Sequence, residues 1–298
     1  MKELPEHLTG NAQKALLMST EERISYVRRP CWIEYTKAKE AIDKLEYLRT
    51  HPKVHRMPNV LLVADTNNGK TMIVNRFRGL HPPCDNEEGE AIRYPVLVVQ
   101  APPVPDEGRL YNAILTEIGA PYRERDSPDK KHYQVVEILS QIETKVLVID
   151  EIHDLLAGTA KKQQQVLNVI KSLGNKLRIP FVAVGTENAY QVFQGDPQMM
   201  NRFEPIRLPK WSIDVKGKGD FLTLLSGFEK ALPLWNPSNL YQKQDIVFKL
   251  LSMCEGLIGE LNSVLTLACV EAIKSKHEQI TLKTLDKIGW TPPSKRKL

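Results

Sequence analysis

A short segment between residues 64 and 71 combines the residue types that bind nucleotide phosphates. It reads Ala64-Asp65-Thr66-Asn67-Asn68-Gly69-Lys70-Thr71 and lies between an apolar run and a segment with helical spacing. In such a loop glycine lets the backbone approach the phosphates, and backbone N–H groups and the helix N-terminus receive their charge. Lys70 would reach the β- and γ-phosphates, and the Thr71 hydroxyl is a candidate Mg²⁺ ligand. The segment predicts a P-loop that binds ATP and Mg²⁺.

Ala64 stands where most P-loops have their first glycine. Alanine can replace glycine at the end of a strand if φ is negative there. The alternative is a loop that matches by chance, and the strand-loop-helix context argues against it.

Two carboxylates follow an apolar run farther along the chain. The run Lys145-Val-Leu-Val-Ile149 leads into Asp150 and Glu151. A strand here would place both at the carboxyl edge of a sheet, where the P-loop also lies. Asp150 fits the Mg²⁺-holding role, and Glu151 is placed to polarise the attacking water as general base. The pair favours hydrolysis over phosphoryl transfer to a metabolite; a helix N-cap is the alternative.

Two more polar residues are candidates for the catalytic site. Thr186 ends the run Phe181-Val-Ala-Val-Gly185 and is a candidate sensor of the γ-phosphate, or equally an N-cap for a helix that begins at Glu187. Arg202 is a candidate arginine finger that completes the site of a neighbouring subunit. A lone arginine is more often a solvated surface charge, so this second assignment depends on a family argument.

The elements that would position these residues alternate along the chain. Apolar runs bounded by turn residues predict buried strands at residues 59–64, 94–100, 145–149 and 180–184. Segments with helical spacing separate them, at residues 71–77, 110–118, 133–142 and 163–173. This alternation predicts parallel strands joined by right-handed crossovers, with helices on both faces of the sheet. The expected fold class is α/β, a three-layer domain with a parallel sheet.

The segments outside this core differ in composition. Residues 1–57 are polar and predict an N-terminal helical extension packed on the main domain, residues 58–210. Residues 211–288 read as helices and predict a small all-helical domain. Residues 289–298 are basic, with little apolar content, and are expected to be mobile or ordered only on a partner.

The composition of the chain limits its possible location and partners. The apolar stretches of this 298-residue chain are far shorter than the roughly 20 residues that a membrane helix needs, and its start lacks the pattern of a signal peptide. We expect a cytoplasmic protein without a membrane partner. The four cysteines form no CxxC pair, so neither a zinc site nor a disulfide framework is predicted. The net charge of +5 permits contact with phosphate backbones but does not establish it.

The order of these motifs resembles AAA+ ATPases, specifically the TniB/TnsC group of transposition regulators, with MuB a more distant relative. The resemblance spans residues 30–285 and depends on Asp65-Thr-Asn-Asn-Gly-Lys-Thr71, Leu147-Val-Ile-Asp-Glu-Ile-His153, Ile179-Pro-Phe-Val-Ala-Val-Gly-Thr186, Asn201-Arg-Phe203 and Gly256-Leu-Ile-Gly-Glu-Leu261. It implies an AAA+ core followed by a helical lid. It makes Lys70 and Thr71 Walker A residues, Asp150 and Glu151 Walker B residues, Thr186 sensor 1 and Arg202 the arginine finger.

The resemblance also implies a function. Such proteins are ATP hydrolases that assemble on double-stranded DNA as rings or helical filaments. They recruit or regulate a DDE transposase and communicate with a TniQ-type targeting protein. Where AAA+ lids often carry a sensor 2 arginine, this chain has Glu260, so we expect slow, regulatory hydrolysis.

Arg109, Lys130 and Lys131 are candidate DNA contacts, because basic side chains on loops and helix starts can hold a phosphate backbone. Solvated surface charge is the alternative for each. Without a base-reading motif, DNA binding should be independent of sequence and sensitive to salt. The basic tail residues Lys295 to Lys297 are candidates for contact with DNA or with the transposase, and the sequence does not choose between the two.

Other functions fit parts of the pattern. A helicase-loader-like replication ATPase would share the fold and would bind a replicative helicase in a pull-down. A P-loop metabolite kinase would consume ATP only with a small substrate, and the Asp150-Glu151 pair argues against it. A nucleotide-switched signalling scaffold would need repeats or a sensor domain, which the sequence does not show.

Overall fold

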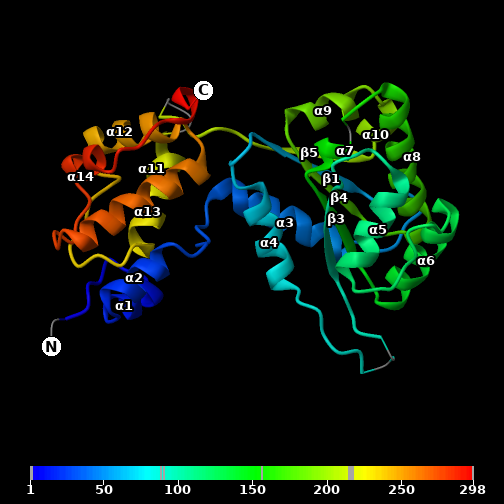
Figure 1. Ribbon diagram of the computed structural model, residues 1–298, viewed down its shortest axis with the longest axis horizontal. Helices are drawn as coiled ribbons and strands as arrows, with labels where there is room; N and C mark the ends of the chain where they lie inside the picture. The colour runs from blue at the N-terminus through cyan, green and yellow to red at the C-terminus, as the bar shows by residue number, and fades with distance from the viewer. Residues whose placement is uncertain (1–2, 88, 90, 156, 214–217, 297–298) are drawn as a thin grey trace. The chain divides into compact units, whose positions relative to one another are not determined.

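The computed structural model describes residues 3–87, 89, 91–155, 157–213 and 218–296. Contacts divide the chain into two compact units (Figure 1): residues 40–208, here called the sheet unit, and residues 1–39 with 209–298, here called the helical unit. The first 39 residues thus share a unit with the C-terminal helices, whereas the sequence placed them in an extension of residues 1–57 packed on the main domain. The division into an extension, a core of residues 58–210, a lid of residues 211–288 and a tail remains a prediction.

A five-stranded parallel sheet forms the centre of the sheet unit, with strand order β2-β3-β4-β1-β5. The strands are β1 (Asn59–Ala64), β2 (Val96–Gln100), β3 (Val146–Asp150), β4 (Phe181–Gly185) and β5 (Phe203–Leu208). Because all strands run the same way, their carboxyl ends meet at one edge, the carboxyl edge, and their starts at the opposite, amino edge. The predicted α/β class with a parallel sheet is confirmed.

The fifth strand was not expected from the sequence. In β5 only Phe203 and Leu208 are buried, so the segment lacks the continuous apolar run of the other strands. Pro205 has no N–H to donate, which a strand tolerates at the edge of a sheet. β5 lies at that edge and, among the described strands, pairs only with β1, with Phe203 opposite Asn59.

Helices cover both faces of the sheet, with α3 and α4 on one side and α5, α6 and α8 on the other (Figure 1). Their bounds are α3 (Thr36–Thr50), α4 (Lys70–Leu80), α5 (Glu107–Glu117), α6 (Pro128–Gln141), α7 (Ile152–Leu155), α8 (Ala160–Leu177), α9 (Glu187–Gln194) and α10 (Pro197–Met200). The start of α3 belongs to the helical unit. Every residue of β3 and β4 is buried, as expected for strands covered on both faces.

The starts of α5 and α6 are fixed by side-chain caps. Asp106 accepts a hydrogen bond from the backbone N–H of Arg109, and Ser127 accepts one from Lys130. Pro128 occupies the first turn of α6, where no N–H partner is needed. Such caps contribute about 1 kcal/mol each to helix stability.

The helical unit contains α1 (Gly10–Leu16), α2 (Thr20–Val27), α11 (Lys218–Ala231), α12 (Gln244–Cys254), α13 (Ile258–Lys274), α14 (Leu282–Lys287) and the 3-10 helix η1 (Pro293–Lys295). A largely buried ion pair of 2.6 Å joins Arg23 of α2 to Glu278, after α13. Among the described residues no single helix is long and apolar enough to cross a membrane; α12 and α13 meet that test only as a pair bent by 118°.

The described part of the C-terminal tail is bound to the helical unit, whereas the sequence predicted a mobile segment. The Trp290 indole N–H donates to the Met253 carbonyl at 2.8 Å. Arg296 forms two hydrogen bonds with the Glu260 carboxylate, at 3.2 and 2.6 Å. Composition did not reveal these partners, because they lie on α12 and α13. Lys297, also predicted to contact DNA or a partner, lies outside the described residues.

Candidate functional site at the carboxyl edge

The segment 64–71 forms a tight loop between β1 and α4. Ala64 is the last residue of β1, so its extended backbone needs no glycine. Asn67 and Gly69 have positive φ values of 61° and 88°, and glycine adopts the second without a steric cost. Asn68 is buried, and its side-chain N–H donates to the Leu208 carbonyl at 3.0 Å. The loop therefore has the backbone shape and the helix N-terminus that bind phosphate.

Lys70 lies inside this loop. Its side chain is buried, and its ammonium donates to the carbonyls of Ala64 and Asp65 at 3.1 and 2.9 Å. Burial lowers the pKa of Lys70, while the charges of Glu151, Asp150 and Asp65 oppose that change. The lysine and both predicted Walker B carboxylates thus act on one another at the same edge.

Thr71 and Asp150 are in direct contact. The Thr71 hydroxyl donates to Asp150 Oδ2 at 2.9 Å, across the gap between α4 and the end of β3. Asp150 is buried, and its other carboxylate oxygen accepts from the Glu151 N–H at 2.9 Å. A hydroxyl and a carboxylate are oxygen ligands that suit Mg²⁺. Within the described ranges no cluster of three His, Cys, Asp or Glu residues could hold a metal, so phosphate and water would supply its remaining ligands.

Glu151 follows directly, with a left-handed backbone at φ 55°. Its carboxylate lies 3.1 Å from Nδ1 of His153, an ion-pair distance without hydrogen-bond alignment. The charge of Glu151 also raises the pKa of Lys70 against the effect of burial, so the predicted base acts on the P-loop lysine as well as contacting His153 of α7. The contact with His153 was not anticipated from the sequence.

Thr186 follows β4 at this same edge. Gly185 pairs with Val63 near the end of β1, which places Thr186 beside the P-loop strand. Thr186 occupies the N-cap position of α9, but its side chain makes no capping hydrogen bond. Its hydroxyl is buried without a hydrogen-bond partner among the residues the structure describes. The hydroxyl therefore has unused hydrogen-bonding capacity at this edge.

Arg202 lies elsewhere in the sheet unit. It precedes β5, whose first residue pairs with the first residue of β1, so Arg202 lies at the amino edge and Lys70 at the carboxyl edge. Its guanidinium donates to Asn175 Oδ1 at 3.2 Å. The structure does not bring Arg202 to the P-loop of its own chain.

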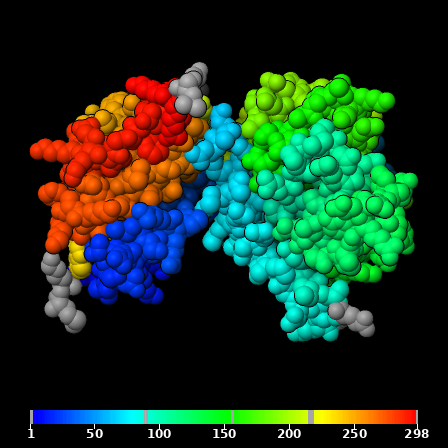
Figure 2. Space-filling model, in the orientation of Figure 1, coloured from blue at the N-terminus to red at the C-terminus, as the bar shows by residue number. Residues whose placement is uncertain are grey.

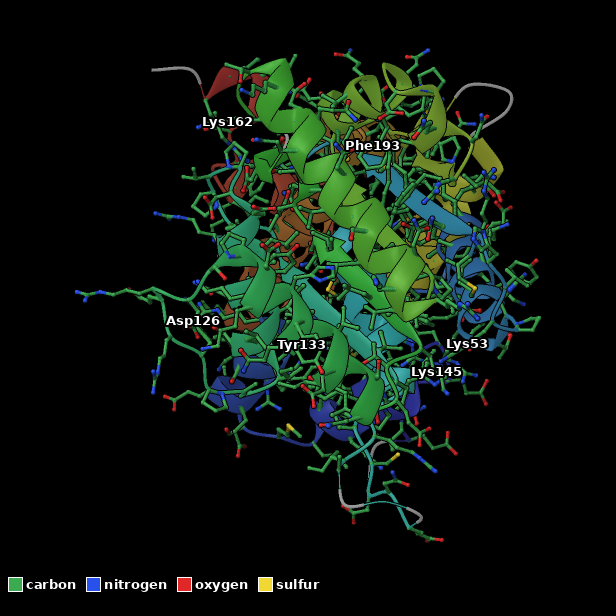
Figure 3. The ribbon with its side chains drawn as sticks, turned by 90° about the vertical axis from the view of Figure 1, so that its right-hand side faces the viewer. Lys53, Asp126, Tyr133, Lys145, Lys162 and Phe193 are labelled. Carbon is green, nitrogen blue, oxygen red and sulfur yellow. The ribbon has the colours of Figure 1, made fainter. Side chains whose placement is uncertain are left out.

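A hollow of about 550 Å³ adjoins Arg202 and is also lined by Arg56, which sequence reasoning missed. The available signal was the basic run that includes Lys53 and Arg56 just before β1. Figure 3 labels Lys53 in the same region of the view as Lys145, the residue before β3, and both precede strands at the amino edge.

The three candidate DNA contacts lie at the starts of α5 and α6. Arg109 and Lys130 are exposed, and Lys130 pairs with Asp126 at 2.9 Å. Lys131 is buried, and its ammonium donates to the Glu124 carbonyl at 2.9 Å, so it does not present its charge to solvent. The segment that contains α5 and α6 faces the viewer in Figure 2 (blue-green).

Two arginines near these candidates were missed. Arg123 and Arg125 are exposed in the loop before α6, which also holds Asp126, labelled in Figure 3. Acidic residues alternate with them in the sequence Arg-Glu-Arg-Asp, so this loop is not uniformly basic. Charge alternation of this kind gave no distinct signal in the sequence.

Comparison with known proteins identifies the family. The family model described as "Bacterial TniB protein" matches residues 23–213 of the chain. This chain belongs to the TniB family. The match spans the P-loop, Asp150, Glu151, Thr186 and Arg202. No curated protein matches the sequence.

Solved structures support the fold of this TniB-family protein. The Aeropyrum pernix ORC1 protein in complex with DNA has a TM-score of 0.61 at 17% identity, covering 91% of this chain and 70% of that chain. CDC6P from Pyrobaculum aerophilum gives 0.60 at 18% identity, with 89% and 69% covered. The Aeropyrum pernix ORC2 protein, in ADPNP-ADP complexes, gives 0.59 at 16% identity, with 88% and 70% covered. At these identities the likeness establishes the fold alone, which is that of AAA+ ATPases.

Proposed function

We propose that this TniB-family protein is an ATP-dependent DNA-binding ATPase that assembles on double-stranded target DNA and recruits or regulates a transposase. The observation that carries the proposal is the 2.9 Å contact between Thr71 and Asp150 beside the buried Lys70. This is a nucleotide site in a chain whose family is associated with transposition. The proposed location is cytoplasmic.

In this proposal the chain's own residues carry hydrolysis. Lys70 and the loop N–H groups bind the phosphates, and Thr71 and Asp150 would hold Mg²⁺, which when bound would neutralise charge that develops on the phosphates. Glu151 takes a proton from the attacking water. The unbonded hydroxyl of Thr186 contacts the γ-phosphate or that water.

Arg202 acts on a neighbouring copy. Because Arg202 and Lys70 lie at opposite edges of one sheet, the arginine reaches a P-loop only if copies associate head to tail. Such heterologous contacts generate rings or helical filaments. Self-association on DNA and arginine-assisted hydrolysis are therefore parts of one proposal.

DNA binding is proposed through Arg109 and Lys130, the two exposed candidates, with Lys131 left out because it is buried. The ORC1 structure that resembles this chain contains DNA, which supports testing the same ligand here. The proposed protein partners are a DDE transposase and a TniQ-type targeting protein. The proposed hydrolysis is slow, because Glu260 replaces a lid arginine.

The test is binding of a labelled DNA duplex at fixed salt, with ATP, a non-hydrolysable analogue, ADP or no nucleotide. We expect ATP and the analogue to promote large assemblies on DNA. Lys70→Ala should abolish these assemblies, and Glu151→Gln should make them persist.

Absence of DNA binding in every nucleotide state would overturn the proposal and direct attention to a P-loop enzyme with a small substrate. Recovery of a replicative helicase instead of a transposase in a pull-down would favour the replication alternative. Salt titration provides a further check, because binding through phosphate contacts weakens steeply as salt rises.

A further inference from the structure

We propose that His153 is a positioning residue that orients Glu151 toward the attacking water. This inference rests on the proposed role of Glu151 as general base. His153 belongs to the segment Asp150-Glu-Ile-His153, but the nucleotide site described above makes no use of it.

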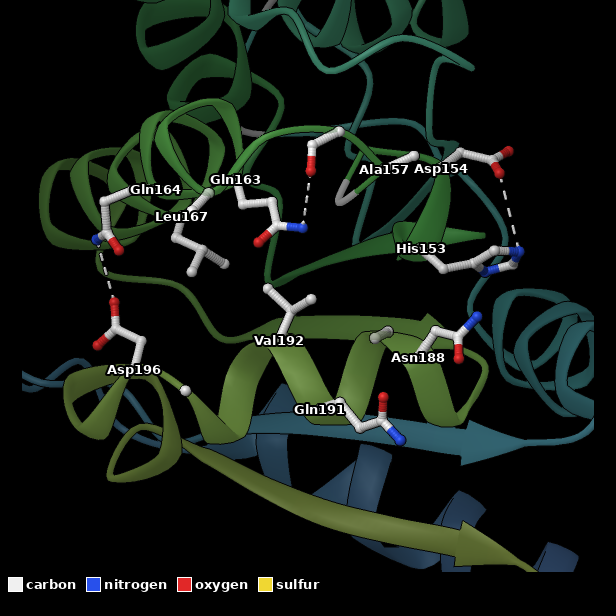
Figure 4. A pocket seen from close by; sticks show the side chains of 14 residues that line it. His153, Asp154, Ala157, Gln163, Gln164, Leu167, Asn188, Gln191, Val192 and Asp196 are labelled. Atoms are coloured by element: carbon white, nitrogen blue, oxygen red, sulfur yellow. Dashed lines mark hydrogen bonds and ion pairs between the residues drawn. The ribbon is translucent and has the colours of Figure 1, made fainter.

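Glu151 interacts both with the P-loop lysine and with His153. Glu151 acts on the charge of Lys70 on one side, and its carboxylate lies 3.1 Å from His153 Nδ1 on the other. The second ring nitrogen of His153 lies 3.8 Å from the Asp154 carboxylate, the contact drawn in Figure 4. The imidazole thus stands between two carboxylates, and Asp154 can orient the ring that contacts the base.

The backbone conformation of Glu151 restricts where its carboxylate can lie. Its backbone is left-handed at φ 55°, a conformation that is unfavourable for a non-glycine residue and persists only where surrounding structure enforces it. The Asp150 carboxylate accepts from the Glu151 N–H and helps to hold this turn. The turn fixes the backbone of Glu151, but its long side chain still needs a partner that fixes its rotamer.

His153 can be that partner because its own helix is anchored. Ile152 is fully buried, and α7 packs against β4 so closely that a Cβ on Gly185 would lie 2.9 Å from Ile152 Cγ2. The missing side chain at Gly185 therefore permits the approach that places His153 beside Glu151. The same close contact ties α7 to the strand that ends at Thr186.

The contact between His153 and Glu151 leaves room for adjustment. The Nδ1 atom of His153 is buried and has no aligned hydrogen bond among the described residues, although Glu151 is at contact distance. Catalytic hydrogen bonds are often poorly aligned without substrate and tighten in the bound complex. His153 also borders a hollow of about 760 Å³, lined by residues of α8 and α9 (Figure 4), into which the ring can move.

The test measures kcat and KM for ATP with the full chain on duplex DNA. His153→Ala should lower kcat about tenfold and leave KM within about threefold, because a positioning effect on the base acts on the chemical step. His153→Asn keeps a side-chain N–H and should recover part of that loss. His132→Ala, at a histidine on α6 whose ring packs against Tyr111 and lies within hydrogen-bond distance of Ser172, is the matched control and should change neither constant.

A double-mutant cycle distinguishes this inference from the proposed function. In a Glu151→Gln background, His153→Ala should cause no further loss of kcat. If Glu151→Gln lowers kcat but His153→Ala does not, the positioning role is wrong and the proposed base stands. If Glu151→Gln leaves kcat unchanged, the proposed base itself is wrong. A rise in KM alone with His153→Ala would also overturn the inference.

Discussion

The Thr71 hydroxyl donates a 2.9 Å hydrogen bond to Asp150, which joins the P-loop helix to the end of β3. Thr71→Val keeps the side-chain volume but removes the donor, and we expect it to cost about 1–2 kcal/mol of stability without nucleotide. It should also lose most of the thermal stabilisation by ATP that requires Mg²⁺. Thermal unfolding with ATP plus Mg²⁺ and with ATP plus EDTA measures both effects.

Thr71→Ser provides the control for this prediction, because it keeps the hydroxyl. It should retain the Mg²⁺-dependent stabilisation. Equal Mg²⁺-dependent stabilisation of the Val and Ser variants would show that the hydroxyl is not a metal ligand.

Arg202 lies at the edge of the sheet opposite the nucleotide site, so we predict that a defect at Arg202 and a defect at Glu151 complement each other in mixed assemblies. Arg202→Ala alone should reduce DNA-stimulated ATP hydrolysis about 100-fold or more, within the range known for arginine fingers. Mixing it with Glu151→Gln, which is expected to keep its assemblies, should restore part of the activity, since the Arg202→Ala copy supplies an intact nucleotide site and the Glu151→Gln copy an intact arginine. Hydrolysis by mixtures of varied ratio is the measurement.

Arg178→Ala is the matched control for Arg202→Ala, because Arg178 is an exposed arginine that also precedes a strand at the amino edge. It should keep full activity. No recovery in the mixtures, together with assemblies of normal size, would contradict an arginine acting between copies.

Asp196 links α8 to α10 and should contribute stability that depends on pH. Burial alone would raise its pKa, but hydrogen bonds from Lys171, Gln164 and Met199 lower it from 3.8 to about 2. The deprotonated form is therefore favoured in the fold, and its contribution is present above pH 3.8 and lost as pH falls toward 2. Asp196→Asn should cost about 2 kcal/mol at neutral pH, and the cost should shrink below pH 4.

Urea unfolding at several pH values measures this difference. Glu187→Gln serves as the control, because the ion pair of Glu187 with Arg207 is more than half exposed on both sides. It should change stability by less than about 0.5 kcal/mol at any pH. A cost for Asp196→Asn that does not vary with pH would assign its role to packing instead of charge.

The Glu260–Arg296 pair predicts a protected C-terminal segment. Arg296→Ala should expose the chain around Lys295 to trypsin, because it removes two hydrogen bonds to Glu260 and the contact of the guanidinium with the Trp290 ring. The expected loss of stability is about 1 kcal/mol, since the arginine is partly exposed. Limited proteolysis and hydrogen exchange provide the measurements, and unchanged cleavage at Lys295 would refute the docking of the tail.

The sequence predicted the part of the fold that leaves a local pattern. Continuous apolar runs located four strands to within a few residues, because buried parallel strands need apolar side chains on both faces. β5 was not predicted, because an edge strand with Glu204 and Pro205 among its first three residues needs no such run. Local pattern also located the P-loop and the acidic pair, which are contiguous in sequence.

Contacts between segments that are distant in the chain could not be predicted from a single sequence. The burial of Lys131 depends on the Glu124 carbonyl, and the approach of His153 to Glu151 depends on a left-handed backbone that glutamate rarely adopts. Glu260 was recognised only as a replacement for a lid arginine. Its pairing with Arg296 became visible when the helices were placed in space.

The hydrogen bond from the Asn68 side chain to the Leu208 carbonyl connects the phosphate-binding loop to the end of β5. Leu208 is the last residue of the sheet unit before the chain continues into the helical unit at Pro209. A nucleotide that shifts the loop must therefore either break this hydrogen bond or pull on the end of β5. One buried amide thus tethers the loop that holds the phosphates to the point where the chain leaves the sheet.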